Sequence, residues 1–276
     1  MYHQQTGLNF LRSSKNLVVL KTDKNLGPAV LERSIFIQRV YEEHLLTKDY
    51  RQLSHSQANG RFKAITRIVR KHISTFHMKP NERNDRLIYT DEGKFILFHL
   101  KNALESDPFS YFYLLPKVHK NPWTTRPIVS YSGSLLYGIA KWLDSTLQKI
   151  VDHIPYTVHS SKDFVDHLQE LHTLPPSATL CTIDAKSMYT NIDTNHAITV
   201  LSTFLNTSTY ATGIDPNACI DAIKIVMRHN IFKFGDTYWV QMNGTAMGTP
   251  PAPTYAQLYY LVHELTFVRN FPQILF

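Results

Sequence analysis

Cysteine is scarce in this chain of 276 residues, which contains only Cys181 and Cys219. One lies in an apolar run and the other in a segment with helical periodicity, so they provide neither a disulfide framework nor the thiolate ligands of a zinc site. We therefore expect no disulfide partner and a reducing, intracellular compartment. The 14 histidines are scattered without a metal-ligand spacing, apart from the loose pair of His153 and His159, and predict no zinc site.

Long apolar runs are missing as well. The longest hydrophobic stretches are too short and too interrupted to cross a bilayer, and the first residues lack the charged start and apolar middle of a signal peptide. The sequence thus predicts no membrane partner. Hydrophobic residues still make up 43% of the chain, which allows a large core in one domain or in two lobes that share a cleft.

The net charge of +7 is unevenly distributed along the chain. Residues 1–130 contain 21 Lys and Arg against 11 Asp and Glu, whereas residues 131–276 contain 8 against 11. A basic first half suits a polyanionic backbone, and a mildly acidic second half suits carboxylates gathered around metal ions. The distribution favours a nucleic-acid partner, but moderately basic proteins without such a partner are also common.

The pattern of apolar residues predicts an α+β fold. Residues 17–31 are predicted to form a hairpin around Gly27, and residues 79–109, rich in polar and turn-forming residues, are predicted to be a connector. Further strands are predicted at residues 112–115, 126–130 and 180–184 and in a hairpin at 231–240. Helices are predicted at residues 35–45, 62–76, 135–151, from 160 onward, and at 193–204, 215–229 and 253–268.

Basic residues surround the apolar stripe of the predicted helix at 62–76. Arg67, Arg70 and Lys71 are the candidates for contact with nucleic-acid phosphates. The alternative interpretation is an ordinary solvated helix face.

A carboxylate follows the apolar run at residues 180–184. Asp184 would project from the end of this strand into a cleft, where hard divalent cations take oxygen ligands. The alternative is a residue that caps the turn after the strand. Tyr189 follows five positions later, and an aromatic ring at such a place belongs either to a binding site or, more commonly, to the core.

Two further segments carry candidate binding groups. Residues 244–253 read Gly-Thr-Ala-Met-Gly-Thr-Pro-Pro-Ala-Pro, in which glycines allow a close backbone approach and prolines stiffen the entry to a helix. Residues 113–130 contain Lys117, Lys120 and Arg126. A guanidinium can hold phosphate oxygens bidentately, so Arg126 is the better phosphate ligand, and either lysine can supply a second charge. An exposed basic turn is the alternative.

Taken in their order along the chain, these segments resemble the motifs of the reverse transcriptases of Penelope-like retroelements. The resemblance extends from about residue 17 to residue 276. A polar turn, Asp23-Lys24-Asn25-Leu26-Gly27, also matches an upstream motif of that family and of telomerase-like enzymes. The other matching segments are residues 113–130, 180–192 and 244–264.

The resemblance implies a right-hand polymerase. Residues 1–110 would be a helical, basic region and the start of the fingers, residues 111–160 the fingers hairpin and helix, and residues 161–276 the palm. It implies templated addition of deoxynucleotides, with an RNA template, a DNA primer and deoxynucleoside triphosphates as partners. Mg²⁺ or Mn²⁺ is the implied cofactor, and the nucleus the implied location.

The same resemblance implies roles for single residues in the palm. Asp184 would be the catalytic residue and bind both metal ions, and Ala185 would add its backbone carbonyl. Tyr189 would stack beneath the sugar and exclude a 2′ hydroxyl. Gly248 and Thr249 would contact the base and sugar of the forming pair.

The implied roles in the fingers are electrostatic. Arg126 and one of Lys117 and Lys120 would close over the triphosphate, and the sequence leaves open which lysine does so. Lys24 would contact the template backbone.

One feature of the family is missing, because two adjacent aspartates occur nowhere in the sequence. The second catalytic carboxylate pair is therefore absent, and we expect an incomplete palm and a chain that is inactive alone. A non-catalytic nucleic-acid-binding remnant of a decayed element is the alternative. A globular protein that shares only the palm fold is a third possibility.

Overall fold

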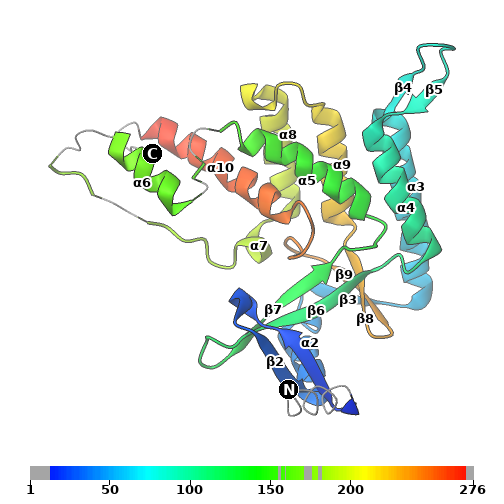
Figure 1. The fold of residues 1–276 in the computed structure, drawn as a ribbon, viewed down its shortest axis with the longest axis vertical. Coiled ribbons are helices and arrows are strands. Elements are labelled where there is room, and N and C mark those ends of the chain that lie inside the picture. Colours follow the sequence, from blue (N-terminus) through cyan, green and yellow to red (C-terminus); the bar gives the residue numbers. More distant parts are fainter. Residues whose placement is uncertain (1–12, 155–156, 159, 171–175, 180–181, 272–276) are drawn as a thin grey trace, which may run out of the picture.

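The computed structural model describes a mixed α and β protein, in agreement with the predicted α+β class (Figure 1). The described residues are 13–154, 157–158, 160–170, 176–179 and 182–271. The strands are β1 (Leu17–Lys21), β2 (Pro28–Glu32), β3 (Tyr50–Leu53), β4 (Met78–Pro80), β5 (Leu87–Tyr89), β6 (Ser110–Lys117), β7 (Thr124–Ser130), β8 (Ile231–Phe234) and β9 (Thr237–Gln241).

The helices include one short segment, α7, that becomes important for the candidate site. They are α2 (Arg33–Val40), α3 (His55–Phe76), α4 (Asp91–Glu105), α5 (Tyr137–Val151), α6 (Ser161–Glu170), α7 (Met188–Asn191), α8 (Thr194–Thr207), α9 (Pro216–Arg228) and α10 (Ala252–Asn270). Three further helical turns are η1 (Asp23–Asn25), η2 (Tyr41–Leu45) and η3 (Thr209–Ala211).

A five-stranded sheet of order β3-β9-β8-β6-β7 lies at the centre of the fold. Its neighbouring strands are antiparallel except for β6 and β8, which are parallel. The sheet takes strands from all three predicted ranges, 1–110, 111–160 and 161–276, and the division into these ranges stays a prediction.

The alternation of buried and exposed residues along Ser110–Lys117 explains why β6 forms at this place. Ser110, Phe112 and Leu114 are buried, whereas Tyr111 and Tyr113 between them are exposed, which is the period of a half-buried strand. The ring of Phe112 stacks on that of Phe232 in β8, with 5.3 Å between the ring centroids.

The helices form the other half of the core. α5 packs against α4, α9 and α10, and α8 packs against α9 and α10. Figure 1 places α5, α8, α9 and α10 together on one side of the sheet, the β1–β2 hairpin and α2 on the opposite side, and α3 beside α4 along one flank. N-caps explain two of these helix starts, because Asp193 caps α8 and Asp215 caps α9, which begins with Pro216.

The predicted connector at residues 79–109 is wrong. Most of it is helix α4, whose first turn is capped by the Thr90 hydroxyl, and β4 and β5 form a hairpin before it. Ile96, Leu100 and Ala103 are buried at helical spacing, so the apolar stripe outweighs the polar residues around it. Strand β3, which pairs with β9, is not among the predicted elements.

The predicted strand at residues 180–184 is also wrong where it can be assessed. Leu180 and Cys181 lie outside the described residues, and residues 182–185 form no strand. Ile183 is 95% exposed. An isolated extended segment is stable only when it pairs with a neighbouring strand, and no described strand pairs with this one.

No helix in the described part of the chain is long and apolar enough to cross a membrane. Cys219 is a free, buried thiol in α9, whereas Cys181 lies outside the described residues.

Two buried histidines connect α3 to the helices around it. The Nδ1–H of His72 donates to Oδ2 of Asp221 at 2.8 Å, so the Nε2 of His72 is free to accept from Nε2–H of His77 at 3.2 Å. Burial lowers the pKa of His77 to about 4, and the His72 charge contributes to the same effect. Burial also lowers the pKa of His72, and the Asp221 carboxylate opposes this change.

Gly138→Ala tests the contact between α4 and α5. A Cβ at Gly138 would lie 2.9 Å from His99 Cβ and 3.1 Å from Ile96 Cα, so we expect a loss of about 2 kcal/mol in the free energy of unfolding. The control is Gly60→Ala in α3, where a Cβ meets nothing within 4 Å and we expect a gain of up to about 1 kcal/mol. Equal effects in chemical denaturation would contradict the packing of these two helices.

The histidine pair predicts that the protein loses stability in mild acid. The unfolded state takes up protons near pH 6.5 and folded His77 only near pH 4, so the free energy of unfolding should fall as the pH drops between these values. We expect this loss to be smaller by about 2 kcal/mol in His77→Gln, which keeps a donor for His72 but does not titrate. Urea unfolding at several pH values measures it, with His119→Gln at an exposed turn as the control. An unchanged pH dependence in His77→Gln would refute the assignment.

Candidate functional site

The loop that leads into α10 lies directly against β7. The backbone N–H of Val129 donates to the carbonyl of Met247 at 2.8 Å. Gly248 has a φ of +101°, and a Cβ on it would lie 2.6 Å from the Val129 carbonyl oxygen. The loop can approach β7 this closely only because residue 248 is a glycine.

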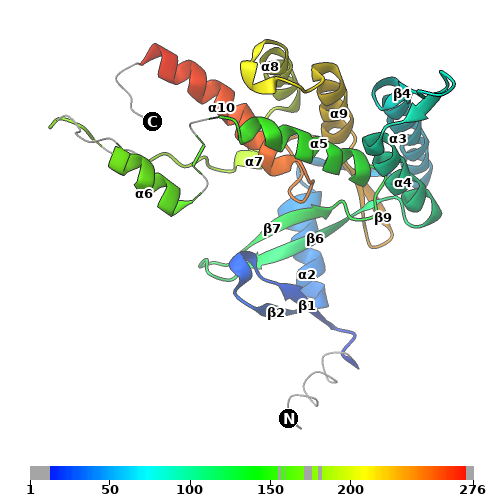
Figure 2. The ribbon, with the colours of Figure 1, turned by 45° about the horizontal axis from the view of Figure 1, so that its top comes forward.

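The same loop contacts the turn that carries Tyr189. The N–H of Thr245 donates to the carbonyl of Tyr189 at 2.7 Å. Gly244 has a φ of +70°, and a Cβ on it would lie 2.8 Å from both the Tyr189 oxygen and Thr190 Cα. One loop thus joins two segments that are far from it and from each other in the sequence, and Figures 1 and 2 show α7 and the loop before α10 next to β7.

Tyr189 is half-buried in α7 and packs against the core. The helix is entered through Ser187, which has the left-handed φ of 53°. Burial raises the pKa of Tyr189, and the positive charge of Arg126 opposes this rise. The Arg126 guanidinium therefore lies within electrostatic range of the tyrosine hydroxyl.

Arg126 forms an ion pair with the turn between β1 and β2. Its Nη1 lies 2.9 Å from Oδ1 of Asp23 in η1. The arginine side chain is 40% exposed and that of Asp23 only 4%. We call the residues that these contacts connect the motif junction: Asp23, Arg126, Tyr189, Gly244 and Gly248.

The register of the β6–β7 hairpin distinguishes the two candidate lysines. Arg126 lies opposite Leu115, and Lys117 lies opposite Thr124. Paired residues share a face of the sheet, as do residues two apart in one strand, so the register puts Lys117 on the same face as Arg126. Lys120 lies in the exposed turn beyond the strands. Lys117 is thus the better candidate for the second positive charge beside Arg126.

Thr249, which the resemblance places against the forming base pair, is buried. It is only 3% exposed, which leaves its side chain inaccessible to a ligand. Burial raises the pKa of Tyr131 above its ordinary value, and the Thr249 hydroxyl lies close enough to oppose part of this rise. At this point of the loop, the group that a ligand can approach is the Gly248 backbone.

Asp184 and Ala185 lie in an exposed segment before α7, not at the end of a buried strand as predicted. Among the described residues, no group of three or more His, Cys, Asp or Glu is arranged to hold a metal ion. Two divalent cations need several oxygen ligands, so the described residues do not fit a complete two-ion site. Asp184 remains a candidate ligand by its position in the sequence.

The basic residues predicted on α3 lie away from the motif junction. Arg67, Arg70 and Lys71 are exposed on a helix that packs against β3 and β9, at the sheet edge opposite β7. Lys24 is different, because it is exposed in η1 next to Asp23.

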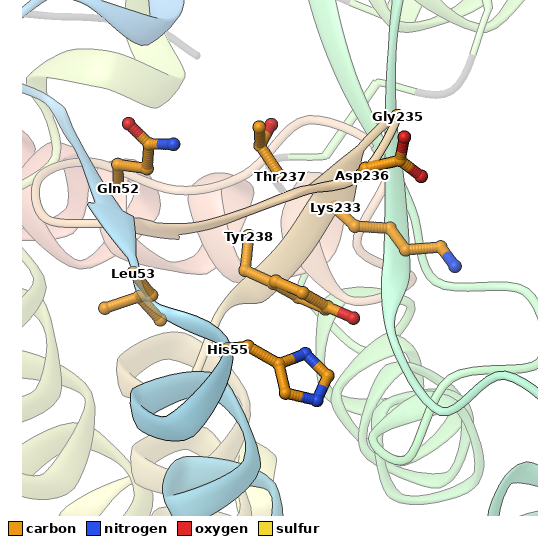
Figure 3. Close-up of a pocket in the computed structure, with 8 residues that line it drawn as sticks. All are labelled: Gln52, Leu53, His55, Lys233, Gly235, Asp236, Thr237 and Tyr238. Carbon is orange, nitrogen blue, oxygen red and sulfur yellow. The ribbon is translucent and has the colours of Figure 1, made fainter.

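A separate hollow of about 270 Å³ lies where β3, β8 and β9 meet the start of α3 (Figure 3). Lys233 forms an ion pair with Asp107, and the ring of His55 packs edge-on against Tyr238 with 5.5 Å between centroids. These polar groups already have partners within the protein, and none belongs to the motif junction. The hollow is therefore not the candidate site.

No family model matches this chain, and no curated protein matches it.

Sequence reasoning missed the ion pair between Asp23 and Arg126. The signal was the Asp-Lys-Asn-Leu-Gly turn, but nothing in the sequence indicates that its aspartate is buried or that the turn reaches a strand about a hundred residues later.

Gly248→Ala tests the close approach of the loop to β7. It combines a left-handed backbone with a backbone clash, so we expect a loss of about 3 kcal/mol in the free energy of unfolding. The matched control is Gly235→Ala, which has a φ of +54° and open space around it and should lose only about 1 kcal/mol. Equal losses in both variants would mean that the loop does not lie on β7.

Proposed function

We propose that this chain is the fingers and palm portion of a reverse transcriptase like those of Penelope-like retroelements, and that the motif junction binds the incoming deoxynucleoside triphosphate. One observation carries the proposal. The loop that contains Gly244 and Gly248 touches β7 beside Arg126 at one point and the Tyr189 turn at another. Motifs that are widely separated in the sequence therefore meet at one place, and this supports the proposal.

The triphosphate end of the nucleotide would lie at Arg126 and Lys117. With Nη1 engaged by Asp23, the guanidinium still has donors on Nε and Nη2 for phosphate oxygens. Charge-assisted hydrogen bonds of this kind are short and strong, and a second cation on the same face of the sheet adds to the attraction.

The sugar and base would lie between Tyr189 and the glycine loop. A half-buried ring is held in place by the core, so it can exclude a 2′ hydroxyl by its bulk. Gly248 presents only backbone, which lets a base pair come close. Lys24 is exposed beside Asp23, and in this proposal it would contact the template backbone.

Catalysis of nucleotide transfer requires more than these residues. By the family resemblance, Asp184 would hold Mg²⁺ or Mn²⁺, and the bound ions would supply the Lewis-acid chemistry of nucleotide transfer. Asp184 is the only carboxylate in the matching segment at residues 180–192, and the sequence contains no adjacent aspartates. We therefore infer that this chain binds nucleotide and nucleic acid but does not catalyse transfer by itself.

The alternative is a nucleic-acid-binding remnant of a decayed element, without nucleotide recognition. The missing aspartate pair favours it. Salt dependence separates the two possibilities, because a remnant should bind primer–template with a steep loss of affinity in salt and no response to a deoxynucleotide.

Arg126→Ala tests the proposed site. We expect it to weaken binding of a fluorescent deoxyguanosine triphosphate about 10- to 100-fold, because a phosphate loses its bidentate partner. Equilibrium titration measures this, and Arg67→Ala on the distant α3 is the charge-matched control. Equal affinity in Arg126→Ala and the parent protein would contradict the proposal.

A primer-extension assay tests the inference about catalysis. We expect residues 1–276 to extend no primer on an RNA template with Mg²⁺, because two cations lack their carboxylate ligands. Templated extension that disappears in Asp184→Asn would show that the chain is a complete enzyme.

A further inference from the structure

The turn at η1 adopts an unfavourable backbone conformation. Lys24 and Asn25 have φ angles of 58° and 55°, in the left-handed region that favours glycine, and Gly27 has 91°. The N–H and the hydroxyl of Thr22 both donate to the Gly27 carbonyl, at 3.2 and 2.6 Å, and close the turn. Strained residues of this kind persist where the surrounding structure requires them, and they concentrate at functional sites.

The carboxylate of Asp23 is not used to stabilise its own turn. An aspartate in a turn ordinarily accepts hydrogen bonds from backbone N–H groups one to three residues later. Here Oδ1 pairs with Arg126, and the buried Oδ2 has no hydrogen-bond partner among the described residues. A buried carboxylate with one unpaired oxygen is unfavourable for folding. The role of the Asp23 carboxylate is therefore its contact with Arg126, and not the stabilisation of its own turn.

We propose that Asp23 is a positioning residue that fixes the guanidinium of Arg126 for the triphosphate. This inference rests on the proposed function of the motif junction. The ion pair occupies Nη1 and holds the side chain in one orientation before the nucleotide arrives, so that less rotamer freedom is lost on binding. The proposal also gives the Asp-Lys-Asn-Leu-Gly turn a physical role.

The burial of the two side chains indicates that Asp23 positions Arg126, and not the reverse. Asp23 is 4% exposed and belongs to a turn that packs against β6, so it cannot move easily. Arg126 is 40% exposed, on a strand whose next residues contact the glycine loop. The fixed partner is thus the carboxylate, and the partner that faces a ligand is the arginine.

The test is a double-mutant cycle with Asp23→Asn and Arg126→Ala, read out with the fluorescent deoxyguanosine triphosphate. We expect Asp23→Asn to weaken nucleotide binding about tenfold in the parent protein and to have no further effect in the Arg126→Ala background. Thr22→Val is the matched control, because it removes the hydroxyl that closes the turn and leaves the ion pair in place. Thermal unfolding of each variant checks that the fold is retained.

A second readout does not depend on nucleotide binding. The NMR signal of the Arg126 Nε–H reports the motion of the guanidinium, and we expect it to become more mobile in Asp23→Asn but not in Thr22→Val. An Arg126 side chain that stays equally ordered in Asp23→Asn would overturn the positioning role, as would equal losses of affinity with and without Arg126. A parent protein that binds no nucleotide but holds Arg126 through Asp23 would instead overturn the proposed function and leave the ion pair supported.

Discussion

The close approach of a glycine loop to the edge strand of the sheet is the contact on which the candidate site depends. Gly248 sits against the backbone of β7 at a distance that no side chain allows, and Gly244 does the same against the Tyr189 turn. The hydrogen bonds from Val129 and Thr245 fix the loop on both sides. These contacts join the strand that carries Arg126 to the turn that carries Tyr189.

The polar side of the site is built around one arginine. Asp23 forms an ion pair with it, Tyr189 lies within range of its charge, and the register puts Lys117 on the same face. The metal-binding part of the site is incomplete, because Asp184 is exposed and belongs to no described group of three or more metal-ligating side chains. This asymmetry is consistent with the proposal of a nucleotide-binding chain that does not catalyse transfer by itself.

Local signals in the sequence predicted much of the fold. Helices α8 and α9 and the hairpin of β8 and β9 were predictable because their caps, proline and turn lie within each element. Strand β3 could not be predicted, since its pairing partner β9 is nearly two hundred residues away. The sequence motifs were sufficient to propose Arg126, Tyr189 and Gly248 as site residues. The choice of Lys117 over Lys120 required the strand register, and the role of Asp23 required the observed ion pair.

Hydrogen exchange at two backbone amides tests the central contact most directly. The N–H of Val129 donates to Met247 in the loop, and the N–H of Thr245 in the loop donates to Tyr189. Both amides should therefore exchange at least about 100-fold more slowly than the amide of exposed Asp184. That result would place the glycine loop on β7 and on the tyrosine turn in solution. Exchange of Val129 and Thr245 as fast as that of Asp184 would mean that the motifs do not meet, and the proposed site would not exist.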